Sequence, residues 1–110
     1  MDQDFALVDR LRALFDGDPR IIEKKMFGGV TFMMNGHMLV SSKKDGRMLV
    51  HVGKNANAAA LERPGATQMV HGDKPMRGFI WIDADETESD DTLRDWIALA
   101  ERFVMTQKPK

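Results

Sequence analysis

Two hairpin signals in the middle of the chain constrain its fold most. Asn35-Gly36 and Asp45-Gly46 are residue pairs that favour two-residue turns between antiparallel strands. The stretches that they separate have apolar residues at alternate positions, as strands with one buried face do. These stretches run from Met26 to Met34, from His37 to Lys43 and from Arg47 to Val52. The sequence therefore predicts a three-stranded antiparallel meander.

Helical spacing of apolar residues marks both ends of the chain. A first helix is predicted between Asp4 and Phe15, with Phe5, Val8, Leu11, Leu14 and Phe15 on one face, before Gly17-Asp18-Pro19 ends it. The last helix has the most regular pattern, because Ser89 can cap it and acidic residues fill its first turn. Its apolar stripe comprises Leu93, Trp96, Ile97, Ala100, Phe103 and Val104.

A short helix and two strands are predicted between the meander and the last helix. The helix is the Ala-rich segment from Asn55 to Glu62, with Asn57 as a candidate cap. The strands are expected from Gln68 to His71 and from Gly78 to Asp83. The order helix, three strands, helix, two strands, helix is typical of a two-layer α+β fold. Because 110 residues is a usual domain size, we expect residues 1–110 to form a single domain.

Charge balance and cysteine content limit the classes of function. With 16 Lys and Arg against 17 Asp and Glu, the net charge is -1, so any contact with an anionic partner has to be local. The absence of Cys excludes disulfides, thiolate metal sites and cysteine nucleophiles. The first residues are acidic, unlike a signal peptide, and no apolar run reaches the roughly 18 residues of a membrane span. We therefore expect a cytoplasmic protein.

No residue pattern indicates a catalytic, cofactor or metal site. His37 and His51 fall on opposite sides of the predicted sheet and cannot share a metal ion. The acidic run 83–91 resembles a calcium loop only superficially, because Glu88 stands where such a loop needs Gly, and Arg94 where it needs a bidentate Glu. None of the serines lies in a nucleophile-elbow sequence. The sequence predicts a protein that is not an enzyme and has no cofactor.

Four short motifs, in this order and at these separations, resemble the N-terminal domain of the TfoX/Sxy family of competence regulators. They are Met26-Phe27-Gly28-Gly29, Asn35-Gly36-His37-Met38, Leu61-Glu62-Arg63-Pro64-Gly65-Ala66 and Pro75-Met76-Arg77-Gly78-Phe79, followed by a closing helix with Trp96. The resemblance spans nearly the whole chain. It implies an α+β fold like that of type III secretion chaperones and a regulatory role. Longer relatives continue into a second, helical domain suited to DNA or protein contact.

Both faces of the predicted meander are apolar. If both turns have two residues, Phe32 faces Leu39 and Leu39 faces Val52, on the face that the helices cover. Val30, Met34, Met48 and Val50 join that face. The opposite face then carries Met33, Met38, Val40 and Leu49, beside Thr31, Ser42, Arg47 and His51. It is too apolar to face water, so we expect a homodimer or a protein partner to cover it. A one-residue slip in either turn would exchange the faces.

A cluster of basic residues supports an alternative hypothesis. Lys43, Lys44 and Arg47 crowd one hairpin tip, and Lys24 and Lys25 precede the meander. These side chains could contact phosphates, although no aromatic residues that would stack on bases are interleaved with them. The leading hypothesis is a non-enzymatic regulatory or adaptor domain that acts through protein-protein contacts. The alternative is a nucleic-acid-associated module that uses these basic residues.

Overall fold

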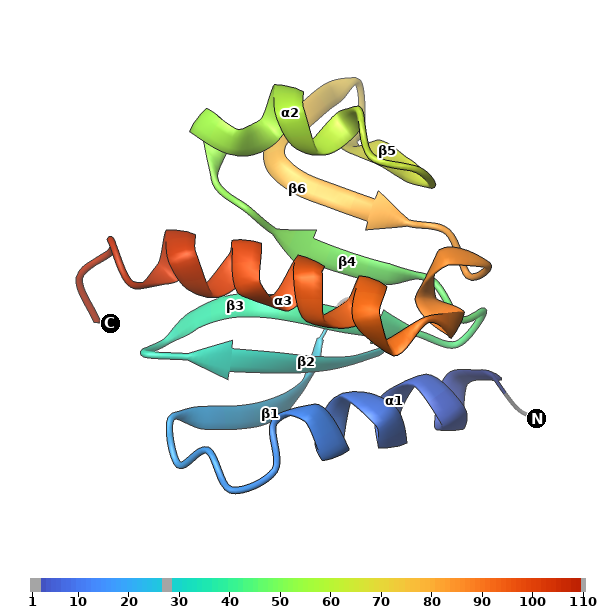
Figure 1. Ribbon diagram of the computed structural model, residues 1–110. Helices are drawn as coiled ribbons and strands as arrows, with labels where there is room; N and C mark the ends of the chain where they lie inside the picture. Colours follow the sequence, from blue (N-terminus) through green and yellow to red (C-terminus); the bar gives the residue numbers. More distant parts are fainter. Residues whose placement is uncertain (1–2, 27–28, 110) are drawn as a thin grey trace.

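A single antiparallel sheet forms one layer of the protein (Figure 1). The computed structural model describes residues 3–26 and 29–109. The sheet has six strands in the order β1-β2-β3-β4-β6-β5. Their bounds are β1 Ile21–Met26, β2 Gly29–Met34, β3 His37–Lys43, β4 Met48–His51, β5 Ala66–His71 and β6 Lys74–Ile82. The α+β fold class is thereby confirmed, with a meander of four strands in place of the expected three.

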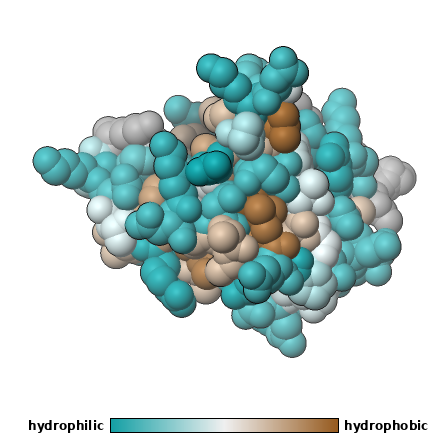
Figure 2. Space-filling model, turned by 90° about the horizontal axis from the view of Figure 1, so that it is seen from above, coloured by the Kyte–Doolittle hydropathy of each residue, from teal (hydrophilic) through white to brown (hydrophobic). Residues whose placement is uncertain are grey.

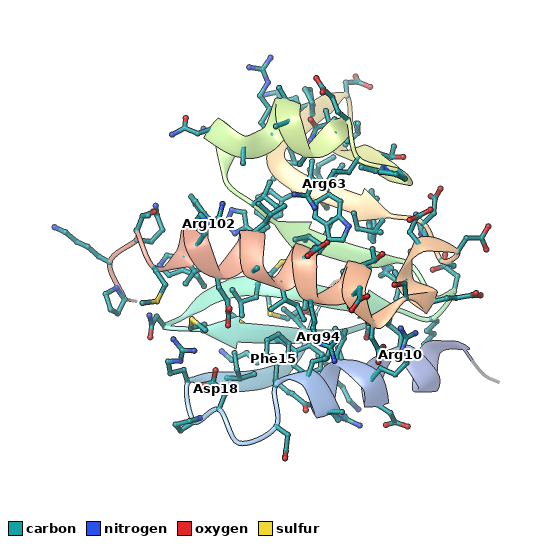
Figure 3. The ribbon with its side chains drawn as sticks, in the orientation of Figure 1. Arg10, Phe15, Asp18, Arg63, Arg94 and Arg102 are labelled. Atoms are coloured by element: carbon teal, nitrogen blue, oxygen red, sulfur yellow. The ribbon has the colours of Figure 1, made fainter. Side chains whose placement is uncertain are left out.

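The helices form the second layer and share one core with the sheet (Figure 1). They are α1 (Gln3–Leu14), α2 (Asn57–Leu61), which continues a 3-10 turn at Lys54–Ala56, and α3 (Asp90–Val104), which follows a 3-10 turn at Glu86–Glu88. Leu11 and Phe15 of the first helical segment share the core cluster with Phe32 of β2, and the Phe15 and Phe32 ring centroids lie 5.2 Å apart. Phe15 is labelled in Figure 3. Most of the last helix's predicted stripe is buried, namely Leu93, Trp96, Ile97, Ala100 and Val104.

Strand β1 is an element that was not predicted from the sequence. Only Ile21 in this strand is even partly buried, and the other five residues are exposed. Glu23, Lys24 and Lys25 interrupt any alternation of apolar residues. Glu23 Oε2 lies 2.9 Å from Nε of Arg12 in α1. This exposed ion pair helps to hold the strand at the edge of the sheet. Charged edge strands of this kind discourage pairing with other chains.

The first hairpin turn is confirmed, but a bulge follows it. Asn35 and Gly36 both have positive φ values, 56° and 84°, which a type I′ turn requires. The register then shifts between Phe32 and Met33, so that Phe32 lies opposite Val40 and not opposite Leu39. Leu39 and Val40 both belong to the core under the helices. The predicted position of Val40 on the outer face is therefore wrong, because the bulge adds one residue to β3.

The second turn is one residue longer than predicted. Lys43 and Arg47 close it through a 2.8 Å hydrogen bond from the Lys43 N–H to the Arg47 carbonyl. Leu49 consequently pairs with Ser41, and Met48 pairs with Ser42. Ser42, expected on the outer face, lies on the helix side with Met48. The bulge and the longer turn compensate, so Val30, Phe32, Met34, Leu39, Met48, Val50 and Val52 still contribute to the core as predicted.

A polar network fixes the base of the β5–β6 hairpin. Asn57 was expected to cap α2, but its side chain instead accepts a 2.7 Å hydrogen bond from the Gly78 N–H and donates one of 2.7 Å to Gln68. Gln68 in turn donates to the carbonyls of Met76 and Phe79 at 2.8 and 3.2 Å. This network satisfies backbone groups next to a second bulge, between Gln68 and Val70. The outer part of the hairpin is thus anchored to α2.

Candidate protein-binding face of the sheet

The pairing register divides the sheet into a core face and a second face that we call the open face. Residues directly opposite each other in neighbouring strands point to the same side. Lys24 lies opposite Thr31, Thr31 opposite Ser41, Ser41 opposite Leu49, and Leu49 opposite Trp81. By strand alternation the open face also holds Ile22, Met33, Met38, Lys43, Arg47, His51, Thr67 and Phe79. At one end of the open face His51 contacts Phe103 of α3, and in the middle of the face Leu49 lies outside the core cluster although it is buried.

The middle of the open face is closed off from solvent within the single chain. Thr31, Ser41 and Leu49 are fully buried, and the Thr31 hydroxyl donates a 2.9 Å hydrogen bond to the Ser41 hydroxyl. Met38 is 7% exposed. Of the four predicted interface residues, only Met33 is therefore partly exposed to solvent. Met38, Val40 and Leu49 are buried.

An apolar corner of the open face is formed near the first hairpin turn. Ile22 of β1 lies opposite Met33 of β2, and Met33 lies opposite Met38 of β3. Ile22 is 59% exposed, which is unusual for an isoleucine on a strand. Because β1 was not predicted, Ile22 was not among the predicted interface residues. The corner is a short row of exposed, half-buried and buried apolar side chains across neighbouring strands.

A basic and aromatic corner lies at the end of the open face near the second hairpin turn. The Arg47 guanidinium carbon lies 4.5 Å from the Trp81 ring centroid, and the Lys43 ammonium nitrogen 5.6 Å from it. Both distances are in the range of cation–π contacts. Arg47 also pairs with Asp45 at 2.8 Å. Burial acts to raise the pKa of Asp45, but hydrogen bonds from the Arg47 backbone and guanidinium outweigh it and lower that pKa.

The remaining predicted basic contacts do not gather at one place. Lys24 points to the open face opposite Thr31, whereas its neighbour Lys25 lies opposite Val30 and points to the helix side. Lys44 is exposed in the turn that follows β3. The structure thus brings Lys24, Lys43 and Arg47 to one face and separates Lys25 from them. It also adds Trp81, which sequence reasoning missed, although alternation along Gly78 to Asp83 would have placed it beside Leu49.

His37 and His51 lie on different sides of the sheet, as predicted. His37 lies opposite Met34 on the core side, and its Nε2 is 2.8 Å from the carbonyl oxygen of Lys108. His51 stacks on Phe79, with ring centroids 4.1 Å apart, and tilts against Phe103 at 4.7 Å. In the described part of the chain, no three His, Asp or Glu side chains are grouped as a metal site would need. The open face offers apolar, aromatic and cationic contacts.

Comparison with known proteins gives a family. The family model described as the TfoX N-terminal domain matches residues 13–104. The chain belongs to the TfoX N-terminal domain family. No curated protein and no solved structure matched the chain. The matched segment of this TfoX N-terminal domain contains every strand of the sheet, and with them the whole open face.

The glycines of the motifs that carry the resemblance have structural reasons. A Cβ on Gly29 would collide with the backbone carbonyl of Ser42, so β2 and β3 can pair there only if residue 29 is Gly. Gly78 has a φ of 94° and lies against the backbone of Gly53 and Lys54. These constraints belong to the sheet and its turns, not to a reaction centre. Among the described helices of this TfoX N-terminal domain, none is long and apolar enough to cross a membrane.

Proposed function

We propose that this TfoX N-terminal domain is a non-enzymatic, cytoplasmic regulatory or adaptor module that binds a protein through the open face. The observation that carries the proposal is the apolar corner. The buried residues of α1, α2 and α3 share a core with the opposite face of the sheet, and Ile22 remains 59% exposed beside Met33. Full burial of an exposed isoleucine contributes roughly 1.5–3 kcal/mol, and the 59% of Ile22 that is exposed leaves about 1–2 kcal/mol to be gained on binding, enough for one anchor of an interface.

The charges of the open face favour a partner with an acidic group. Lys43 and Arg47 flank Trp81 at one end of the face, and Lys24 lies on the edge strand. Asp45 is bound to Arg47 in the same corner, so the excess charge there is small and positive. A partner segment with one apolar residue and one or two carboxylates would satisfy both corners. Such contacts provide orientation and specificity more than affinity.

The test replaces Ile22 with Glu. The exposed side chain contributes little to the core, so the melting temperature should stay within a few degrees of wild type. Capture of proteins from an extract of the native cell, quantified against wild type, should fall at least about tenfold for the partner, because a charge would be buried unpaired. Met105→Glu is the matched control, since Met105 is 61% exposed and follows α3, away from the open face.

Equal capture by wild type and Ile22→Glu would contradict the proposal. Loss of capture with both Ile22→Glu and Met105→Glu would also contradict it, because the effect would then follow from general surface charge. Only a loss confined to Ile22→Glu supports contact through the open face.

One structural observation supports the alternative function, association with nucleic acid. Lys24, Lys43 and Arg47 share the open face with an aromatic ring, Trp81, on which a base could stack. If this reading holds, a gel-shift series with single-stranded and duplex oligonucleotides should show binding at low salt that weakens steeply as salt rises. Lys43→Glu should weaken the shift, and Lys25→Glu, on the other side of the sheet, should weaken it less. Absence of binding at low salt would remove the alternative.

A further inference from the structure

The two edges of the sheet differ in how well they are protected against pairing. The edge strand β1 carries Glu23, Lys24 and Lys25. The other edge strand, β5, has the sequence Ala-Thr-Gln-Met-Val-His from Ala66 to His71, without Asp, Glu, Lys, Arg or Pro. Charges and prolines are the usual protection of an edge strand, whose outer backbone groups otherwise offer a template for another strand. The edge strand β5 is therefore the less protected of the two, since the bulge between Gln68 and Val70 interrupts it but no charge or proline does.

The outer part of the β5–β6 hairpin extends beyond the cover of the helices. Residues 70–77 are all exposed, although both strands continue into this segment. They include two exposed apolar side chains, Val70 at 55% and Met76 at 36%. Figure 2, which looks onto the side of the molecule that carries α2, β5 and β6, shows apolar patches within a largely hydrophilic surface. We call residues 70–77 the arm.

The arm is held in place at its base. The Gln68 side chain bonds to the carbonyls of Met76 and Phe79, and Asn57 bonds to both Gln68 and the Gly78 N–H. A surface that is fixed before binding loses less conformational entropy when a partner docks. The edge of β5 is thus both free of charged residues and pre-organised.

Opposite charges lie at the two ends of β5. The end of the strand leads into the arm, which carries Lys74 and Arg77 beside His71, with Asp73 as its single acid. The start of the strand abuts the acidic segment 83–91. The Asp83 N–H donates a 3.0 Å hydrogen bond to the Gly65 carbonyl, and the Glu86 side chain packs against Gly65. One end of the same edge is therefore basic and the other is acidic.

We infer that two copies of this chain pair along β5 in antiparallel orientation about a two-fold axis. In that arrangement the end of one β5 lies beside the start of the other, so the arm of each copy meets the acidic segment of its partner. The same contact is made twice, as an isologous interface requires. Val70, the exposed apolar residue of β5, is covered in the pair. This assignment replaces the open face as the site of self-association, because Met38, Val40 and Leu49 are buried within one chain.

The first test measures molar mass by light scattering over a range of concentrations. The wild type should approach twice the mass of one chain as concentration rises. Val70→Lys should weaken the pair at least about tenfold, because it places a charge in the paired edge. Ile22→Lys is the matched control, since Ile22 is exposed to a similar extent, 59% against 55%, on the opposite edge strand. It should pair like wild type. Both replaced side chains are exposed, so circular dichroism should show both variants folded.

A charge exchange between two variants supplies an independent test. Lys74→Glu with Arg77→Glu makes the arm acidic, and Asp83→Lys with Glu86→Lys makes the segment that it meets basic. Each double variant should be monomeric alone, because like charges then face each other at both contacts. An equimolar mixture of the two should pair, since opposite charges meet at both contacts again.

A wild type that stays monomeric at high concentration and low salt would overturn the inference. So would a dimer that survives Val70→Lys, or a mixture of the charge variants that fails to pair although each is folded. A dimer lost with Ile22→Lys and kept with Val70→Lys would place self-association on the open face. The protein-binding role proposed for the open face is tested with different variants and stands or falls separately.

Discussion

Replacing Trp96 with Ala should remove about 3–5 kcal/mol from the free energy of unfolding, the range for truncation of a large aromatic residue in a core. Trp96 is 1% exposed and is the largest fully buried side chain of the described residues. It belongs to the core cluster between α3 and the sheet. Arg63, which follows α2 and is labelled in Figure 3, lies over it, with the guanidinium carbon 5.2 Å from the Trp96 ring centroid. The surrounding core relaxes only partly into the space that Ala leaves, which is why such truncations cost several kcal/mol.

The measurement is urea unfolding followed by circular dichroism, with Trp81→Ala as the control. Trp81 is the second tryptophan of the chain, half-buried on the open face, and its removal should cost clearly less. The loss of its cation–π contacts adds about 0.5–1 kcal/mol each at exposed sites. A cost for Trp96→Ala below 1 kcal/mol, or equal to that of Trp81→Ala, would contradict the position of α3 on the core face.

Features that depend on neighbours in the sequence were predictable. The last helix follows from its apolar spacing and from Ser89, whose side chain accepts a 3.3 Å hydrogen bond from the Thr92 N–H as a cap does. The first turn follows from Asn35-Gly36, since few other pairs take positive φ at both positions. The core face of the meander could be assigned because alternate burial survives small changes in pairing.

Features that depend on distant contacts were not predictable. β1 has no apolar alternation, and it is a strand because β2 offers it an edge to pair with. The bulge at Phe32 and Met33 has no marker in the sequence, yet it moves Val40 to the core. Asn57 has the chemistry of a helix cap, but two partners distant in sequence, Gln68 and Gly78, compete for its side chain. In each case tertiary pairing overrides a local preference.

The open face likewise combines features that the sequence predicts with features that depend on distant contacts. An apolar outer face was predicted from alternation, and Met33, Met38 and Leu49 do lie on it. How much of each side chain reaches solvent could not be read from the sequence, because burial of Leu49 depends on its neighbours Ser41 and Trp81 in other strands. The proposed anchor, Ile22, belongs to the strand that was missed. The proposed binding surface is therefore set by strand order more than by composition.

The second large effect is expected at Gly78, where Ala should destabilise the protein by at least about 2 kcal/mol. A non-glycine residue at its φ of 94° costs about 1–2 kcal/mol. A Cβ would also lie 2.9 Å from the Gly53 carbonyl carbon and 3.1 Å from the Lys54 nitrogen, which are backbone atoms at the start of the 3-10 turn before α2 and not the end of a flexible side chain. Such overpacking adds about 1–3 kcal/mol. The shift would also strain two bonds of 2.7 Å, from the Gly78 N–H to Asn57 and from the Val52 N–H to the Gly78 carbonyl.

Gly72→Ala separates the two causes, because Gly72 lies in the same hairpin with a φ of 63° and has nothing within 4 Å of its Cβ position. It should show only the backbone cost, so in urea unfolding the difference between the two variants measures the close approach of β6 to Gly53. Equal effects would mean that the backbone at Gly53 and Lys54 moves aside freely. In that case the junction beside Asn57 would not hold the base of the hairpin rigidly, and the pre-organisation of β5 for pairing would be lost with it.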